Sequence, residues 1–311
     1  MNVIELEGGR RLCFATYGAP DGVPVIALHG TPGSRLKYET AHDQAAALGL
    51  NLISIDRWGY GRTDLHPRPT LTGFAEDIAT VADRLGIARF AVIGISGGAP
   101  YACATAARLG DRVLRLALVS PLGPTHLLSP DEMRLFHNFC FRTLPHIPGL
   151  ATAIFRFYRR LLFIAPRSAI ALASLGSVRT DRVLMRTPTV QAELARMFRE
   201  GLAIGARGGV LDLTLFSRPW DFDLGDITAP TRIWYGTDDR NVPQAAAARL
   251  ETDVPGAVLT LLHGEGHFWI SKGYLDVLTW LKDPAMADPR GQLPEPPYPV
   301  GTATPSASGP G

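Results

Sequence analysis

The segment from residue 90 to 98 constrains the fold more than any other part of the chain, because it forces a strand to turn sharply into a helix. It reads Phe-Ala-Val-Ile-Gly-Ile-Ser-Gly-Gly, and small residues typical of a helix follow it. The apolar run predicts a buried strand that ends at Ile95. Gly94 and Gly98 leave room for a tight turn around Ser96. We therefore expect the Ser96 hydroxyl at the end of a sheet strand, beside the first amides of the next helix.

A serine hydroxyl is a poor nucleophile at neutral pH, so a reactive Ser96 requires a histidine base and a carboxylate that orients the base. Two strand-like runs further along the chain each end in a polar loop. The first loop contains Asp238 and Asp239, and the second contains His263 and His267. The chain thus offers a serine, an acid and a histidine in that order, with the acid and the histidine at strand ends.

This order resembles the α/β-hydrolase superfamily, in which an acid follows one late strand and a histidine follows the last. The resemblance implies a serine nucleophile at Ser96. In that family the acid stands in the pattern G-x-x-D-x-x-V-P, and Gly236 and Pro243 here select Asp239 over Asp238. The neighbouring Asp238 is then a turn residue.

The choice of the histidine rests on a second similarity. Residues 266–268 read Gly-His-Phe, like the G-H-F segment of the family. The resemblance implies that His267 is the base and that His263 is a loop residue. The spacing of these two histidines around Glu265 also resembles a zinc-binding pair. Such a pair requires a helix, however, and glycines on both sides of Glu265 argue against one. We expect no metal and no cofactor.

The loop after the strand-like run at residues 25–28 resembles the H-G-x-P-G segment of the same family, which supplies half of an oxyanion hole. Pro32 has no amide hydrogen, so the candidate donor in this loop is the backbone N–H of Thr31. The second candidate donor is the backbone N–H of Gly97, the residue after the nucleophile. We interpret His29 as a residue that bonds neighbouring loops and holds the turn.

Residues 56–64, Asp-Arg-Trp-Gly-Tyr-Gly-Arg-Thr-Asp, look like the D-x-x-G-x-G-x-S/T segment of the superfamily. We interpret this segment as structural, since two glycines and a salt-bridging Asp/Arg set mainly fix a turn. Its glycine spacing does not match a dinucleotide-binding fingerprint.

Strand and helix patterns alternate along most of the chain, which predicts an α/β fold with a mostly parallel sheet covered on both faces. One of the helices is marked by the spacing of Phe74, Ile78, Val81 and Leu85, which predicts a buried stripe. Residues 1–123 and 224–282 form the expected α/β-hydrolase core. Residues 124–223 have helical patterns, which resemble the inserted cap of many α/β-hydrolases, and residues 283–311 form an expected disordered tail.

The cap segment holds 13 arginines, no lysine and 8 acidic residues. One interpretation is an acidic substrate, and the other is that arginine stems cover apolar helix flanks. Six apolar residues of one helix lie opposite three arginines and form a face typical of core: Ile154, Phe155, Phe157, Tyr158, Leu161 and Leu162, opposite Arg156, Arg159 and Arg160. Part of this face is also compatible with an acyl pocket or a membrane surface, and the sequence leaves the choice open.

The composition fits a cytoplasmic protein, and the resemblance implies that its partner is a small-molecule acyl substrate. The net charge of +2 gives no indication of a nucleic-acid partner. The start of the chain does not resemble a leader, and no apolar run is long enough to cross a membrane. The three cysteines are scattered along the chain. We do not expect membrane contact, and the oligomeric state stays open.

The predicted reaction is ester hydrolysis through an acyl-enzyme. A proline iminopeptidase is an alternative, but those enzymes usually carry glycine where Thr31 stands and tryptophan where Gly97 stands. A cofactor-free oxygenase or haloperoxidase-like enzyme keeps a similar triad. A ligand-binding receptor with a hydrolase fold is the non-enzymatic alternative.

Overall fold

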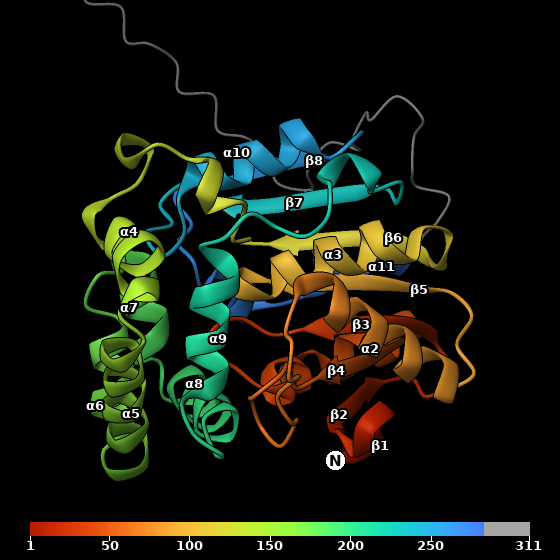
Figure 1. The fold of residues 1–311 in the computed structure, drawn as a ribbon, viewed down its shortest axis with the longest axis horizontal. Coiled ribbons are helices and arrows are strands. Elements are labelled where there is room, and N and C mark those ends of the chain that lie inside the picture. Colours follow the sequence, from red (N-terminus) through yellow and green to blue (C-terminus); the bar gives the residue numbers. More distant parts are fainter. Residues whose placement is uncertain (283–311) are drawn as a thin grey trace, which may run out of the picture.

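The computed structural model describes residues 1–282, and the predicted disordered tail lies outside these residues. The core is a single sheet in the order β1-β2-β4-β3-β5-β6-β7-β8 (Figure 1). The antiparallel pairs are β1 with β2 and β2 with β4, and the pairs from β4 to β8 are parallel. The strands are β1 (Asn2–Glu5), β2 (Arg11–Gly18), β3 (Val23–Leu28), β4 (Leu50–Ile55), β5 (Phe90–Ile95), β6 (Val113–Val119), β7 (Thr231–Gly236) and β8 (Val258–Leu262).

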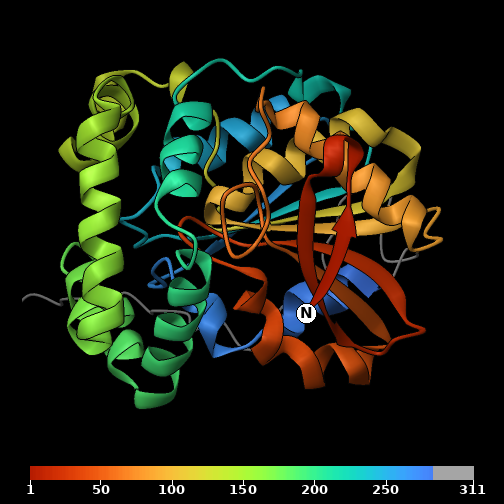
Figure 2. The same ribbon diagram turned by 60° about the horizontal axis from the view of Figure 1, so that its bottom comes forward.

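Helices cover both faces of this sheet, as the alternating pattern predicts (Figure 2). One face carries α2 (Leu71–Arg84), α3 (Ala99–Leu109) and α10 (Gln244–Asp253), and the other carries α1 (His42–Leu48) and α11 (Leu275–Lys282). The strands alternate between the two apolar cores. On β3, Ile26 and Leu28 belong to one core and Val25 and Ala27 to the other.

The predicted stripe of α2 is correct for three of its four residues. Phe74, Ile78 and Val81 are fully buried, whereas Leu85 is 40% exposed. The prediction for Leu85 is wrong because the helix ends at Arg84, and Leu85 is its C-cap. A stripe continues only as long as the helix that carries it.

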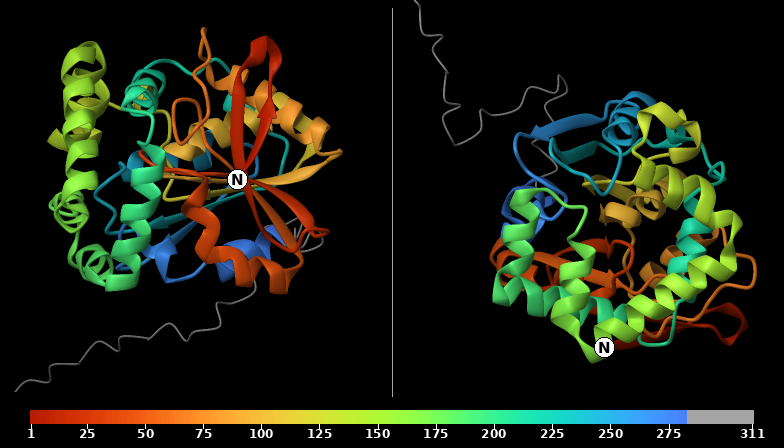
Figure 3. Two further views of the ribbon diagram at one scale, coloured as in Figure 1. Left: turned by 90° about the horizontal axis from the view of Figure 1, so that it is seen from below. Right: turned by 90° about the vertical axis from the view of Figure 1, so that its left-hand side faces the viewer.

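The chain between β6 and β7 forms a helical insertion, a name we use for residues 124–223. It lies at the carboxyl ends of the strands, with α4 to α7 farthest from the sheet (Figure 1; Figure 3, left). The insertion has an apolar core of its own, which includes Leu162, Ile170, Met185 and Leu194. Its helices are α4 (Leu135–Asn138), α5 (Pro148–Ile164), α6 (Pro166–Ala173), α7 (Arg179–Arg186), α8 (Pro188–Gly201) and α9 (Arg207–Phe216). The division of the chain into domains stays a prediction.

Within residues 1–282, no helix combines the length and the apolar character that a bilayer span requires.

Candidate active site

Ser96 occupies a strained turn between β5 and α3. Its φ of 52° lies in the left-handed region, which residues other than glycine rarely adopt. The surrounding turn is too crowded for larger residues, because a Cβ atom at Gly94 would lie 2.7 Å from the Ala102 Cβ and one at Gly98 would lie 2.5 Å from the Leu28 carbonyl oxygen. Such strain costs about 1–3 kcal/mol and persists where the surrounding structure enforces it. The geometry agrees with the sharp turn expected from the sequence.

Ser96, His267 and Asp239 form a continuous hydrogen-bonded chain. His267 Nε2 lies 3.1 Å from Ser96 Oγ, and His267 Nδ1 lies 2.6 Å from Asp239 Oδ2. The second oxygen of Asp239 accepts the backbone N–H groups of Asn241 and Val242, at 2.7 and 3.2 Å. Both His267 and Asp239 are buried. These contacts give His267 a fixed orientation toward the serine.

The two alternatives weighed in the sequence lie elsewhere. The residues Asp238 and His263 are both exposed. His263 is in the turn after β8, which contains Gly264 at a φ of 74° and is not a helix. The zinc-binding geometry of a helical histidine pair is therefore absent at residues 263–267.

Burial and charge act in opposite directions on His267. Burial disfavours the imidazolium, but the adjacent Asp239 carboxylate outweighs it, so the pKa of His267 is raised above its usual value of 6.5. A base of raised pKa accepts a proton more readily. This is the property that activation of a serine hydroxyl requires.

The loop of residues 29–34, which we call the Thr31 loop, lies directly beside the serine turn. A Cβ atom at Gly30 would lie 3.2 Å from the Ser96 Cβ, and one at Gly97 would lie 2.2 Å from the Thr31 Oγ1. His29 holds this loop, since its Nδ1 is 2.8 Å from the Gly30 carbonyl oxygen. Its Nε2 accepts the backbone N–H of Arg57 at 3.1 Å. Burial and then the charge of Arg57 lower the pKa of His29 well below 6.5, which keeps the ring neutral for this bonding pattern. The interpretation of His29 as a loop-holding residue agrees with these contacts.

Comparisons with known proteins identify the family of this chain. The family model described as alpha/beta hydrolase fold matches residues 23–273. The chain belongs to the α/β-hydrolase family. It is 26% identical over 275 residues to an uncharacterized hydrolase of Bacillus subtilis, with 88% of this chain and 93% of the relative covered. It is 27% identical over 283 residues to a non-heme chloroperoxidase of Streptomyces lividans, with 87% and 94% covered.

A solved structure of an alpha/beta hydrolase fold protein from Nakamurella multipartita has a similar fold. Its TM-score is 0.64 at 25% identity, and the match covers 91% of this chain and 98% of that chain. The resemblance found in the sequence is thereby confirmed at the level of the family and of the fold. This chain is an enzyme of the α/β-hydrolase family.

In this hydrolase, Arg57 connects the Thr31 loop to the helical insertion. Its Nε donates to the His29 carbonyl oxygen at 3.1 Å, and its Nη2 donates to the Gly30 carbonyl oxygen and to Thr31 Oγ1, both at 3.0 Å. Its Nη1 pairs with Asp212 of α9 at 2.6 Å. The interpretation of residues 56–64 as structural agrees with these contacts, but Arg57 also ties the segment to α9. Because the Arg57 side chain is fully buried, its charge needs a carboxylate partner, and Asp212 of α9 provides it.

The Asp212 carboxylate is completely surrounded by donors. Besides Arg57 it accepts the hydroxyls of Tyr101 at 2.8 Å, Tyr60 at 2.7 Å and Thr31 at 2.5 Å. Four donors satisfy a carboxylate that is 1% exposed. Sequence reasoning missed Asp212, although a lone acid between Leu211 and Leu213 was a usable signal.

A second carboxylate of the helical insertion binds the histidine loop of the hydrolase. Asp181 of α7 accepts the backbone N–H groups of His267 and Phe268, both at 2.9 Å, and is buried. Burial raises the pKa of Asp181 above its usual value. Gly266 makes the approach possible, because a Cβ atom there would lie 2.3 Å from an Asp181 oxygen. Sequence reasoning missed this residue too, although Asp181 is the only acid between residues 133 and 192.

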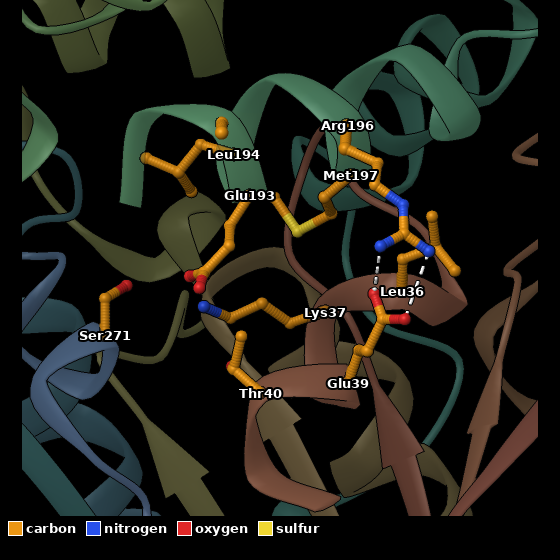
Figure 4. A pocket seen from close by; sticks show the side chains of 10 residues that line it. Leu36, Lys37, Glu39, Thr40, Glu193, Leu194, Arg196, Met197 and Ser271 are labelled. Carbon is orange, nitrogen blue, oxygen red and sulfur yellow. Dashed lines mark hydrogen bonds and ion pairs between the residues drawn. The ribbon is translucent and has the colours of Figure 1, made fainter. Parts of the chain in front are cut away.

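A charged pocket is lined by residues outside the serine–histidine–aspartate chain. It has a volume of about 180 Å³ and lies where α8 meets η2 (Arg35–Ala41) and η10 (Trp269–Lys272). Figure 4 shows the Lys37 ammonium directed toward Glu193, and the ion pair of Arg196 with Glu39 has a separation of 2.7 Å. None of its lining residues belongs to the serine–histidine–aspartate chain. We therefore do not assign this pocket to the reacting part of a substrate.

Proposed function

We propose that this chain is a serine hydrolase that cleaves an ester, or a related acyl bond, of a small molecule. The observation that carries the proposal is the chain of contacts from Ser96 Oγ through His267 to Asp239, at 3.1 and 2.6 Å. A hydroxyl, an imidazole and a carboxylate in this order make up the machinery of acyl transfer. The hydrolase and esterase names among relatives support the same class of reaction.

The reaction begins when His267 Nε2 takes the proton of Ser96 Oγ as this oxygen attacks the substrate carbonyl. Asp239 fixes the Nδ1–H tautomer and stabilises the imidazolium that forms. The backbone N–H groups of Thr31 and Gly97 are the proposed donors to the oxyanion. His267 then gives the proton to the leaving group, and the bond between the carbonyl carbon and the leaving group breaks.

Water completes the cycle in a second step. His267 takes one proton from the water molecule, the resulting hydroxide attacks the acyl carbon, and Ser96 leaves with the proton returned by His267. The products are a carboxylic acid and free enzyme. The helical insertion, as a cap over the serine, would limit the access of bulk water and of large substrates.

The Thr31 loop argues against the iminopeptidase alternative. Those enzymes usually have tryptophan at the position of Gly97, where this chain has no room even for a Cβ atom because Thr31 Oγ1 would lie 2.2 Å away. The Thr31 side chain is itself held by Asp212 and Arg57. A bulky residue at position 97 would require this whole loop to move.

Hydrolysis of p-nitrophenyl acetate, butyrate and octanoate tests the proposal. Ser96→Ala should abolish turnover of all three esters. Asp239→Asn should reduce kcat by about 10⁴-fold, and the matched control Asp238→Asn, in an exposed neighbour, should leave kcat unchanged. Retained turnover in a folded Ser96→Ala variant, or the reverse ranking of the two aspartates, would refute the assignment.

A second candidate rests on the chloroperoxidase relative. If hydrogen peroxide replaces water as the attacking group, the same acyl-serine gives a peracid, which can oxidise a halide. A bromination assay with acetate, peroxide and bromide separates the candidates. Bromination with a higher kcat/KM than ester hydrolysis would favour this alternative.

A further inference from the structure

The helical insertion exposes large apolar side chains more often than the rest of residues 1–282 does. Most of the exposed large apolar side chains of residues 1–282 belong to the insertion. They lie mainly on α4 to α7, the layer farthest from the sheet, and the right-hand view of Figure 3 looks onto this layer. The exposed set includes Leu135, Phe136, Leu150, Ile154, Phe157, Ile164, Leu172, Leu175 and Val183. Exposed apolar side chains grouped on neighbouring helices indicate a binding face.

Helix α5 carries the centre of this surface. Leu150, Ile154, Phe157 and Ile164 follow one another at intervals of four, three and seven residues, which places them on one stripe of the helix. Phe157 is 61% exposed and Ile164 is 69% exposed. The sequence interpretation of an apolar face typical of core is therefore wrong for Ile154 and Phe157. The inner side of α5 is formed by other residues, Ala151, Phe155, Tyr158 and Leu162, which pack into the insertion.

The charge on the same layer has one sign. Residues 133–192 contain nine arginines, no lysine and a single acid, Asp181. Asp181 is buried against the His267 loop, so it offers no negative charge to the surface. Arg156 and Arg160 are exposed on α5 and lie on one side of the apolar stripe. The apolar stripe of α5 thus lies beside cationic side chains, and residues 133–192 offer no exposed acid.

This charge selects the kind of partner. A second copy of the chain in a twofold dimer would bring the same arginine-rich face against itself, which repulsion disfavours. Arginine on the polar side and Phe, Leu and Ile on the other is the composition of helices that lie at the boundary of headgroups and acyl chains. The 17 residues of α5 span about 25 Å, enough for several lipid headgroups.

We propose that the α5 face, defined as Leu150, Ile154, Phe157, Ile164, Arg156 and Arg160, docks onto an anionic bilayer surface with the helix in the membrane plane. The apolar stripe enters the headgroup boundary, and the two guanidinium groups contact lipid phosphates. This proposal reverses the expectation of no membrane contact, because the sequence pattern alone did not reveal which side of α5 is covered. It does not depend on the proposed hydrolase chemistry.

Co-sedimentation with vesicles tests the proposal on the full chain. Vesicles of phosphatidylglycerol and phosphatidylcholine should bind the protein, and vesicles of phosphatidylcholine alone should not. The double variant Arg156→Gln/Arg160→Gln should lower the partition coefficient by about 25-fold, since each cation near an anionic surface contributes about a factor of five. Ile154→Ser/Phe157→Ser should lower it by about tenfold or more.

Matched controls make the outcome specific. Leu275→Ser on α11, where the side chain is 54% exposed, and Arg84→Gln on α2 should leave vesicle binding unchanged. The far-UV circular dichroism spectrum and the urea midpoint of the α5 variants should equal those of the wild type, which shows that they fold. Ser96→Ala should bind vesicles normally, so that failure of this proposal and failure of the hydrolase proposal are separate results.

Three results would overturn the docking proposal. The first is the absence of sedimentation with anionic vesicles at low salt. The second is equal binding by the α5 variants and the wild type. The third is a lipid-free dimer, measured by sedimentation velocity, that Phe157→Ser converts to monomer, since the face would then bind a second copy.

Discussion

The Asp181 carboxylate accepts the backbone N–H groups of His267 and Phe268, both at 2.9 Å, and so joins the helical insertion to the proposed catalytic base. This contact acts on the position of the loop, and the negative charge of Asp181 also raises the pKa of His267. Asp181 therefore connects the docking of α7 with both the orientation and the basicity of the imidazole. We regard it as a positioning residue.

Asp181→Asn should lower kcat/KM for a p-nitrophenyl ester by about 10-fold to 100-fold, because the amide can accept only one of the two N–H groups and the loop shifts. It should also move the acid limb of the pH–rate profile to lower pH, since a negative charge near His267 is lost. A matched control is Arg182→Gln, in the exposed neighbour on α7, which should change neither quantity. A slower variant with an unmoved acid limb would reduce Asp181 to a structural role.

The wild-type pH–rate profile follows from the state that His267 needs. The imidazole must be neutral to accept the Ser96 proton, and the Asp239 carboxylate, against the effect of burial, raises its pKa above 6.5. As pH falls through this raised pKa, His267 becomes protonated and kcat/KM decreases. We expect the acid limb above pH 6.5 in initial rates of ester hydrolysis, and a limb clearly below 6.5 would contradict the geometry of the pair.

Gly97→Ala should remove most of the activity without unfolding the chain. The added Cβ atom would meet Thr31 Oγ1 at 2.2 Å and push the Thr31 loop away from Ser96. Loss of one oxyanion donor typically lowers kcat by about 100-fold to 1000-fold. The control Gly176→Ala adds a methyl group in open space and should leave kcat unchanged. If both variants turn over substrate equally well, the Thr31 loop does not take part in catalysis.

Asp212→Asn should destabilise the protein strongly. The change leaves the fully buried Arg57 guanidinium without its carboxylate, and breaking such a pair costs about 3–5 kcal/mol. Urea unfolding followed by tryptophan fluorescence measures the loss as a lower midpoint. The exposed residue Asp226 offers the control, and Asp226→Asn should unfold at the wild-type midpoint. Equal midpoints for the two variants would show that this pair adds little to stability.

The sequence was informative where spacing along the chain carries the signal. Gly236 and Pro243 pointed to Asp239, and glycines around Ser96 pointed to a strained turn, because these constraints act within a few residues. Asp181 and Asp212 were missed because their partners lie far along the chain, from 86 to 181 residues away. A lone acid in an arginine-rich or apolar helix suggests a buried partner but does not identify it.

Contacts between residues distant in the sequence also decide which face of α5 is covered. Helical spacing separates Ile154 and Phe157 from Phe155 and Tyr158, but it does not say which pair is covered. Only the position of α5 over α8 and α9 decides that, and those contacts join residues distant in the sequence. Spacing along the sequence therefore indicated an amphipathic helix, whereas the structure revealed its exposed side.

Active-site labelling tests the reactivity of Ser96 most directly. After incubation with a fluorophosphonate, intact-mass measurement and peptide mapping should find one adduct per chain, on Ser96, formed with first-order kinetics and strongly slowed by Asp239→Asn. The adduct should be absent from Ser96→Ala. An adduct on another residue, or no adduct on a preparation that still hydrolyses esters, would contradict the assignment of Ser96 as the nucleophile.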